Sequence, residues 1–251
     1  MLSEDRQLRI TTMVRDRGFV TVSQLCDMFG VSEATVRRDL DSLADAGQIR
    51  RVRGGAGNVR GTVRPEPDLR NFADVALTAS EAKRSIARKA AALVEDGDVI
   101  AMDAGTTVAA MCPFLMQRSL TVVTASLAVV DALSSVQDID LVVVGGILRP
   151  NYRSMVGILA EQMLAQIKVD KVFLGTSGIA DDGSVMDTTP SEVPIKQALL
   201  RSARHRYVLA DAEKFEGGGF LKVCGLDRVD ALITDGDVEL PDDVEVEVIK
   251  A

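Results

Sequence analysis

The stretch from residue 31 to residue 56 constrains the fold of this chain more than any other. Ser32 can be the N-cap of a helix, because its hydroxyl accepts a hydrogen bond from a free backbone N–H of the first turn. Gly47 then ends the helix. Between them, apolar residues recur at the i, i+4 and i+7 spacing of one helix face: Val36, Leu40 and Leu43. The sequence therefore predicts a short amphipathic helix, and a basic segment follows it.

The residues before this helix indicate a second, preceding helix. Thr21 and Gln24 have the spacing of a capping box, and Gly30 supplies a tight turn into the helix that Ser32 caps. Residues 48–64 contain five arginines and no acidic residue, as a basic hairpin would. Together these features predict a winged helix-turn-helix, with the helix-turn-helix at about 22–46 and the wing at about 48–56.

Arg38 lies almost opposite the apolar face of the helix, and Arg37 flanks it. Such arginines alone are usually a solvated helix face. Beside a basic hairpin, however, they favour contact with double-stranded DNA, with the helix in the major groove and the hairpin on the flanking backbone or minor groove. The expected DNA contacts are Ser23, Ser32, Glu33, Thr35, Arg37, Arg38, Arg50, Arg51 and Arg53.

The net charge of −8 does not exclude DNA binding, because the charge is unevenly distributed. Residues 1–70 hold twelve arginines against ten acidic residues, which gives +2 and leaves −10 for the rest. The three cysteines have no zinc or redox spacing, and no signal peptide or apolar run of membrane-spanning length is present. We therefore expect a soluble cytoplasmic protein without a metal or cofactor.

The remaining sequence predicts a second domain of the α/β class. Glycine, proline and polar residues indicate a linker at 58–77, between a DNA-binding domain at 1–57 and a domain at 78–251. Strands and helices alternate in the second domain, which implies a largely parallel sheet covered on both faces. The expected strands are 98–102, 120–124, 140–144, 171–175, 206–210, 231–234 and 244–249, and the expected helices are 82–95, 107–116, 127–136, 156–166 and 191–203.

Ligands of such sheets bind at the carboxyl ends of the strands. The loop from Asp103 to Thr107 directly follows a strand and opens a helix, whose N-terminus attracts an anion, although strand-to-helix turns of this composition are also common without a ligand. Lys214 follows another strand end and could meet a phosphate. The predicted ligand residues are Asp103, Gly105, Thr106, Thr107, Thr124, Ser126, Gly145, Gly146, Lys196 and Lys214. Glu192 and Lys196, four residues apart on a helix, could instead be a surface ion pair.

The run from Val20 to Leu40, with Gly47 and the segment RRVRGGA, resembles the N-terminal signature of the DeoR family of bacterial sugar-metabolism repressors. DAGTT, VVVGGILR, FLGTSGIADDGSV and LADAEKF are similar to segments of the sensor domain of that family. Two departures are Arg53, where the family usually has His, and Ala125, where it often has Asn. The resemblance implies a sensor domain like ribose-5-phosphate isomerase and CoA-transferase-like sheets. It also implies that phosphorylated sugars are bound by Asp103, Gly105, Thr106, Thr107 and Lys214.

The favoured interpretation is a DNA-binding repressor of a carbohydrate-metabolism operon that a phosphorylated sugar releases, acting as a homodimer or homotetramer. An alternative is a sugar-phosphate isomerase or transferase with a DNA-binding appendage, which would need a carboxylate base and an electrophile at one carbon. The loop GIADDG does not clearly reproduce the acidic motif of the isomerase, and His205, expected at a helix end, is a poor candidate catalyst. A transcriptional activator would share every residue named above.

Overall fold

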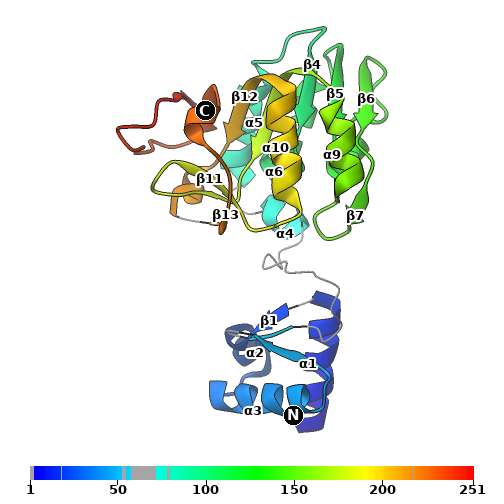
Figure 1. Ribbon diagram of the computed structural model, residues 1–251, viewed down its shortest axis with the longest axis vertical. Coiled ribbons are helices and arrows are strands. Elements are labelled where there is room, and N and C mark those ends of the chain that lie inside the picture. The colour runs from blue at the N-terminus through cyan, green and yellow to red at the C-terminus, as the bar shows by residue number, and fades with distance from the viewer. Residues whose placement is uncertain (1–2, 18, 53–54, 58–71, 78–79, 217) are drawn as a thin grey trace. The chain divides into compact units, whose positions relative to one another are not determined.

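A computed structural model describes residues 3–17, 19–52, 55–57, 72–77, 80–216 and 218–251 (Figure 1). The chain divides into two compact units, Met1–Leu69 and Arg70–Ala251. We call them the N-terminal unit and, after the domain that its sequence resembles, the sensor unit. The described residues form one hydrophobic cluster in the N-terminal unit and two in the sensor unit.

The N-terminal unit is a winged helix-turn-helix, as the sequence predicts. Its three strands form an antiparallel sheet in the order β1-β3-β2, so the strand before the helix-turn-helix pairs with the wing. Val36, Leu40 and Leu43 are buried in the core of the unit, which confirms the apolar helix face. The elements are α1 (Ser3–Arg17), β1 (Phe19–Thr21), α2 (Val22–Phe29), α3 (Glu33–Asp45), β2 (Arg50–Val52) and β3 (Gly55–Gly57).

Local sequence signals set the ends of these helices. Thr21 and Gln24 form both hydrogen bonds of a capping box at the start of α2. Gly30 ends α2 in the left-handed conformation, with φ of 62°, which glycine adopts without steric cost. The Ser32 hydroxyl then accepts a hydrogen bond from the backbone N–H of Thr35, as predicted for the N-cap of α3.

The sensor unit is built on a parallel sheet of seven strands in the order β15-β14-β12-β9-β4-β5-β6, and every neighbouring pair runs parallel. All seven strands overlap strands that the sequence predicts. They are β4 (Val99–Met102), β5 (Leu120–Thr124), β6 (Ile139–Val143), β9 (Val169–Gly175), β12 (Ala203–Leu209), β14 (Ala231–Thr234) and β15 (Glu247–Lys250). The predicted α/β class with a mostly parallel sheet is therefore confirmed.

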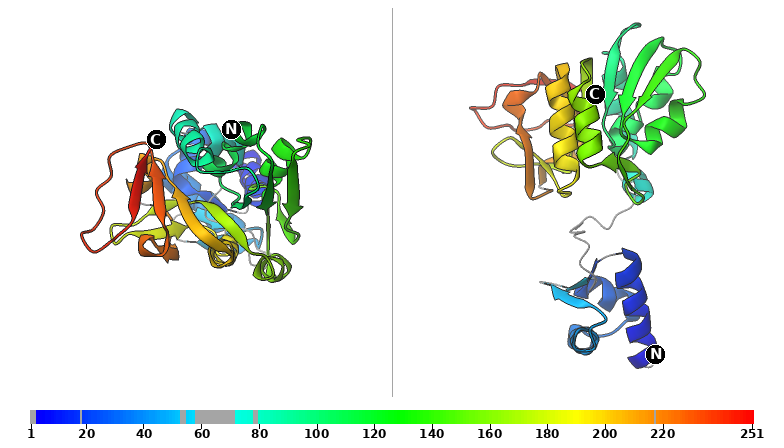
Figure 2. Two further views of the ribbon diagram at one scale, coloured as in Figure 1. Left: turned by 90° about the horizontal axis from the view of Figure 1, so that it is seen from above. Right: turned by 45° about the vertical axis from the view of Figure 1, so that its right-hand side comes forward.

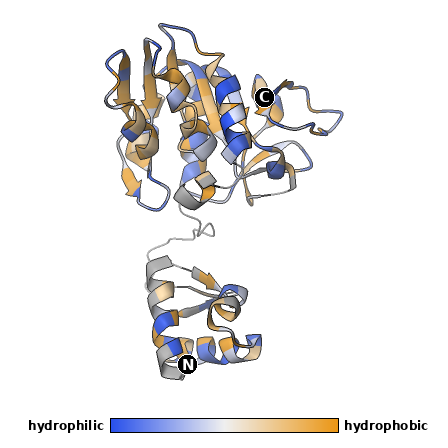
Figure 3. Ribbon diagram, turned by 180° about the vertical axis from the view of Figure 1, so that it is seen from behind, coloured by the Kyte–Doolittle hydropathy of each residue, from blue (hydrophilic) through white to orange (hydrophobic). Residues whose placement is uncertain are grey.

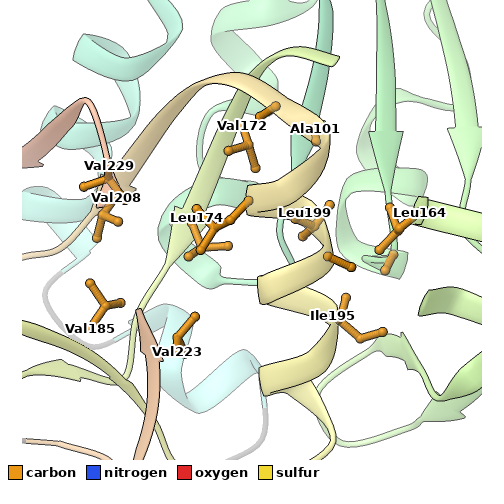
Figure 4. Packing of buried hydrophobic residues seen from close by; sticks show 14 of the residues in the cluster. Ala101, Leu164, Val172, Leu174, Val185, Ile195, Leu199, Val208, Val223 and Val229 are labelled. Carbon is orange, nitrogen blue, oxygen red and sulfur yellow. The ribbon is translucent and has the colours of Figure 1, made fainter. Parts of the chain in front are cut away.

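Helices cover both faces of this sheet. On one face α9 and α10 lie side by side (Figures 1 and 2), and in Figure 4 Leu199 of α10 lies beside Leu174 of β9. The opposite face is covered by α5, α6, α7 and α8, where Ile100 and Phe173 are buried. The helices are α4 (Phe72–Leu77), α5 (Ser80–Ala91), α6 (Thr106–Ala109), α7 (Cys112–Leu115), α8 (Leu127–Leu133), α9 (Ile158–Ala165) and α10 (Glu192–Ser202), with the 3-10 turns η1 (Ala212–Glu216) and η2 (Leu226–Arg228).

Two small sheets were not predicted. One is the hairpin of β7 (Ile147–Arg149) and β8 (Ser154–Val156), which precedes α9. The other contains β10 (Gly178–Ile179), β11 (Ser184–Asp187) and β13 (Leu221–Gly225). None of these strands is a continuous apolar run of four or more residues like β4, from which a buried strand is predicted.

Other elements differ from the expectations in detail. The helix expected at 107–116 is divided into α6 and α7, and α7 carries Pro113 in its first turn, where the missing N–H is tolerated. The helix α4 lies inside the stretch predicted as a linker, and Phe72 N–H donates to the carbonyl of Asn151. His205 lies in β12 and not at a helix end.

The described residues contain no group of histidine, cysteine or acidic side chains arranged to hold a metal ion. Within the same part of the chain, no helix combines the length and apolar character needed to cross a membrane.

Candidate functional site

The first candidate surface is the outer face of α3. Arg38 is exposed there, opposite the buried stripe, and Arg37 forms an exposed ion pair with Glu33 at 2.8 Å. Ser32 is also exposed, and its hydroxyl lies 3.0 Å from the hydroxyl of Thr35. Hydroxyls and guanidinium groups at the N-terminal end of one helix are the groups that hydrogen-bond to base edges and phosphates.

The wing contributes one arginine whose side chain is described. Arg51 forms an ion pair with Asp41 of α3 at 2.9 Å and donates to the carbonyl of Gly55 at 3.3 Å. These contacts hold its guanidinium group between α3 and the wing. Ser23 is exposed on α2, Arg50 belongs to β2, and Arg53 lies outside the described residues.

A buried ion pair that the sequence did not indicate fixes α3 against α1. Arg6 Nε donates to Asp39 at 2.6 Å, and both side chains are buried. Gln7 donates to the other carboxylate oxygen of Asp39 at 3.2 Å. Because Asp39 lies on the inner side of α3, this contact orients the helix while leaving its outer face to solvent.

The second candidate site lies at the carboxyl ends of β4 and β9 in the sensor unit. Asp103, only 2% exposed, follows β4 directly and accepts hydrogen bonds from Gly175 N–H at 3.0 Å and Lys196 Nζ at 2.8 Å. Gly105 and Gly175 approach so closely that a Cβ on either would lie 3.2 Å from the other's Cα. A side chain at position 105 would therefore need the backbone of the neighbouring strand end to shift by a few tenths of an ångström.

The interpretation of Glu192 and Lys196 as a surface ion pair is wrong. Both residues lie on the buried side of α10, at 3% and 6% exposure, and each pairs with a residue from another element. Lys196 Nζ donates to Asp103, lies 3.3 Å from Asp187 and donates to the Gly175 carbonyl at 2.6 Å. Its three N–H groups thus face three acceptors of the protein.

Glu192 belongs to a second buried contact, with the β7–β8 hairpin. It forms an ion pair with Arg149 of β7, accepts a hydrogen bond from the Ser154 hydroxyl of β8, and Arg149 also lies over the ring of Tyr152 at 5.0 Å. The sequence analysis did not single out Arg149, Ser154 or Asp187. A buried arginine can be found from sequence only if its carboxylate partner is known.

Burial and neighbouring charges shift the pKa values of this cluster. Burial raises the pKa of Glu192, although Arg149 opposes the rise. Burial alone would lower the pKa of Lys196, but Asp103 and Asp187 together raise it above its ordinary value, so Lys196 stays charged. The cluster combines three carboxyl groups with two cations, and each carboxyl is held by a cation. Such an arrangement can fix the position of Asp103 for accepting hydrogen bonds from a polar ligand.

The other predicted ligand residues divide into two groups. Thr106 and Lys214 are partly exposed, and Gly105 precedes α6 without a side-chain cap on the first-turn N–H groups, whereas Thr107 is buried. The second group has structural contacts. Thr124 donates to the carbonyl of Met102 at 2.7 Å, Ser126 caps α8, and a Cβ on Gly146 would lie 2.6 Å from the carbonyl of Val156; Gly145 is exposed.

Another buried pair lies at the end of β12. Asp211 follows this strand, and its carboxylate is 3.4 Å from Lys83 of α5. Both side chains are buried. This pair connects α5 to the same edge of the sheet that carries Asp103.

Comparison with known proteins places both units among regulators. A family model described as the DeoR-like helix-turn-helix domain matches residues 6–61, and one described as the DeoR C-terminal sensor domain matches residues 78–236. The HTH-type transcriptional repressor GlcR of Bacillus subtilis is 32% identical, over 94% of this chain and 89% of the relative. The glycerol-3-phosphate regulon repressor of Escherichia coli is 32% identical, over 94% and 92%. Among solved structures, ribose 5-phosphate isomerase A of Methanocaldococcus jannaschii matches 55% of each chain, with a TM-score of 0.41 and 18% identity.

Proposed function

Because the chain belongs to the DeoR family of transcriptional regulators, we propose that it represses a carbohydrate-metabolism operon in the cytoplasm and that a phosphorylated sugar releases it from DNA. It is a DNA-binding regulator and not an enzyme, as its named relatives are regulators. The observation that carries the proposal is the joining of a winged helix-turn-helix to a sensor unit whose strand ends hold a buried, charge-fixed aspartate.

The exposed face of α3 supports the first half of this proposal. We assign base contact to Arg38, which is exposed and which has no ion-pair partner among the described residues. Arg51, held between α3 and the wing, is assigned to a phosphate. Ser23, Ser32, Glu33, Thr35, Arg37, Arg50 and Arg53 complete the proposed DNA contacts.

The geometry at the strand ends supports the second half. The second carboxylate oxygen of Asp103 accepts hydrogen bonds from hydroxyl groups of the sugar, because Lys196 and the Gly175 N–H already fix the first. The phosphate lies toward Gly105, Thr106 and Lys214, away from the three buried carboxyl groups. We assign Lys196 to positioning Asp103, and Thr124, Ser126 and Gly146 to shaping the surrounding loops.

The test uses fluorescence anisotropy to measure binding of the protein to the promoter fragment of the operon adjacent to its gene. A panel of phosphorylated sugars is then added, with the unphosphorylated sugars as controls. We expect one phosphorylated sugar to weaken binding by about 5–150-fold, which corresponds to a coupling free energy of ~1–3 kcal/mol. If no sugar phosphate changes the affinity, the release mechanism is wrong. Reporter transcription in a deletion strain distinguishes repression from activation.

Asp103→Asn is the variant that locates the effector site. The amide oxygen can still accept from Gly175 N–H and Lys196, so the cluster loses a charge without losing its geometry. We expect DNA binding to be retained and release by the sugar phosphate to be lost. Lys214→Gln should likewise retain DNA binding and lose release, because it removes the cation proposed to bind the phosphate of the sugar. Normal release from both variants would place the effector elsewhere.

A further inference from the structure

The buried ion pair between α1 and α3 lies outside the DNA contacts proposed above. Arg6 Nε donates to Asp39 Oδ2 at 2.6 Å, and Arg6 Nη2 donates to Asp39 Oδ1 at 3.2 Å. Gln7 Nε2 donates to the same Oδ1 at 3.2 Å. Arg6 is 8% exposed and Asp39 is 4% exposed. Both oxygens of the carboxylate are therefore held by α1, and a guanidinium group that binds at two points also fixes the direction of the contact.

The stability of the N-terminal unit does not account for this pair. Taking two charges out of water costs free energy that their attraction only roughly offsets, and replacing a buried ion pair by apolar side chains of similar volume is often neutral or stabilising. Apolar neighbours are at hand, because Ile10 of α1 and Leu40 of α3 belong to the same hydrophobic cluster. An apolar pair at positions 6 and 39 would extend this cluster, so the two charges require another explanation.

The pair supplies a directional contact, which the apolar contacts between the helices do not. Apolar side chains attract one another with little dependence on orientation, so they allow α3 to rotate slightly about its own axis. The two parallel hydrogen bonds between Arg6 and Asp39 resist that rotation, because both would lengthen or bend. In Figure 3 the helices α1 and α3 meet near the N-terminus of the chain, and each carries both hydrophobic and hydrophilic residues.

A small rotation of α3 would change what its outer face can bind. Arg38 directly precedes Asp39 and is exposed. Side chains extend roughly 6 Å from a helix axis, so a rotation of about 15° displaces the groups on the outer face by about 1.5 Å. Hydrogen-bond lengths vary by only about 0.5 Å, so such a displacement breaks a contact with a base edge. Phosphate contacts carry no sequence information, and a flexible arginine can re-form them after the same displacement.

We propose that Arg6 and Asp39 are positioning residues for base recognition. They touch no DNA, but they fix the rotation of α3 and so determine how strongly the protein prefers one DNA sequence over another. The inference rests on the proposed base contact of Arg38 and adds two residues on the buried side of the N-terminal unit. Their contribution is to sequence preference and not to the affinity for DNA in general.

The test variant is Arg6→Met with Asp39→Leu, which removes one charge of each sign and leaves the net charge unchanged. The wild-type full chain is first used to select a preferred duplex from a random pool, and a scrambled duplex of equal length is the reference. Fluorescence anisotropy measures the affinity for both. We expect the ratio of the two affinities to fall about 10-fold or more, as for the loss of one base-pair contact. The affinity for the scrambled duplex should change by less than about two-fold, because phosphate contacts dominate it.

Hydrogen exchange of the full chain separates positioning from stability. We expect the amides of α1 and α3 to be as well protected in the double variant as in the wild type, because apolar side chains replace the pair. Arg6→Lys is a second variant that keeps the charge, but an ammonium group cannot form the two parallel hydrogen bonds, so the ratio should fall here too. Val14→Ala is the control. It removes buried carbon atoms of α1 and should lower the protection without changing the ratio.

An unchanged ratio in the folded double variant would overturn the proposal, and so would a wild type that selects no preferred duplex. If the double variant does not fold, the ratio for Arg6→Lys decides in the same way. An equal fall in the ratio for Val14→Ala would show that any loss of stability has this effect, and would also overturn the proposal.

The selected duplex makes this inference separable from the proposed function. A promoter fragment that does not bind, or a sugar phosphate that does not release the protein, would count against the proposed function alone. Arg38→Ala is measured on the same two duplexes. If Arg38→Ala lowers the ratio and the double variant does not, the base contact stands and only the positioning role of Arg6 and Asp39 is wrong.

Discussion

Lys196 balances the charge of two buried carboxylates in the sensor unit. It lies between Asp103 and Asp187, and its surroundings raise its pKa, so the cation persists throughout the physiological pH range. Removal of one partner from a buried pair leaves the other charge without compensation. The stability of the unit should therefore be more sensitive to this side chain than to any exposed lysine.

Lys196→Met should lower the free energy of unfolding by about 3–5 kcal/mol, because two buried carboxylates lose their cation. Equilibrium urea denaturation measures this change. Lys250→Met is the control, since Lys250 pairs with Asp237 at the surface and such pairs contribute about 0–1 kcal/mol. Equal effects in the two variants would contradict the burial argument.

Glu192 should make stability depend on pH in a defined direction. Because burial raises its folded pKa, the carboxyl binds more protons in the folded chain than in the unfolded chain between the two pKa values. Its contribution is complete below the unfolded pKa and is lost as the pH rises through the folded pKa. Relative to Glu192→Gln, the wild type should lose stability from about pH 4 toward neutral pH. Thermal melts across that pH range test this prediction, and Glu213→Gln, at an exposed residue, is the control. If the melting temperatures of the wild type and Glu192→Gln change with pH in parallel, the prediction is wrong.

Two neighbouring glycines decide how β6 leads into the β7–β8 hairpin. A Cβ on Gly146 would lie 2.6 Å from the Val156 carbonyl, whereas a Cβ on Gly145 would meet nothing within 4 Å. The backbone of β8 cannot move away without disturbing Arg149 and Ser154. The hairpin therefore depends on one of the two glycines and not on the other.

Gly146→Ala should destabilise the sensor unit by about 1–3 kcal/mol, because the new methyl group overlaps backbone atoms. Gly145→Ala should change stability by less than about 1 kcal/mol, since the site is open. Urea denaturation of both variants measures the loss in the free energy of unfolding at these two adjacent positions. Similar losses at the two positions would show that the close approach to Val156 is not the cause.

The helix α3 and the wing should contribute differently to DNA binding. Arg38→Ala should weaken binding by about 1–3 kcal/mol and relax the preference for one base pair, because the proposed docking of α3 turns its exposed side chain toward the base edges. Arg51→Ala should weaken all sequences alike and reduce the salt slope by about one unit. Anisotropy titrations on matched and substituted fragments separate the two. Wild-type binding by both variants would contradict the docking of α3.

The negative net charge of the whole molecule opposes DNA binding, so the N-terminal residues must bind DNA despite this repulsion. Residues 1–70 carry +2 and the remaining residues carry −10, which sum to the overall −8. Binding must therefore depend on local phosphate contacts, which release counterions and weaken with salt.

Affinity for a fragment with two half-sites should fall by at least ~10³-fold between 50 and 200 mM salt. The slope of log affinity against log salt should be about twice that for a fragment with one half-site, because the homodimer expected from the sequence would contact twice as many phosphates. Titrations at four salt concentrations measure both slopes. Equal slopes would mean that only one N-terminal unit contacts the DNA.

Local sequence signals were sufficient for the helices of the N-terminal unit and for the strands of the large sheet. The capping box of Thr21 and Gln24, the cap at Ser32 and the buried strand from Val99 to Met102 act over a few residues, so their patterns are legible without long-range contacts. The position of Asp103 at a strand end followed from the same patterns, because parallel strands end at one edge of a sheet.

Only the tertiary structure decided which charged residues are buried and what they contact. Glu192 and Lys196 have the spacing of a surface pair. They can be buried because residues of distant elements neutralise their charges: Arg149 pairs with Glu192, and Asp103 and Asp187 pair with Lys196. Sequence determines periodicity, caps and strand ends, which depend on neighbours along the chain. The pairing of buried charges depends on residues far apart in the sequence, since Lys196 and Asp103 are 93 positions apart, and their meeting is a property of the folded chain alone.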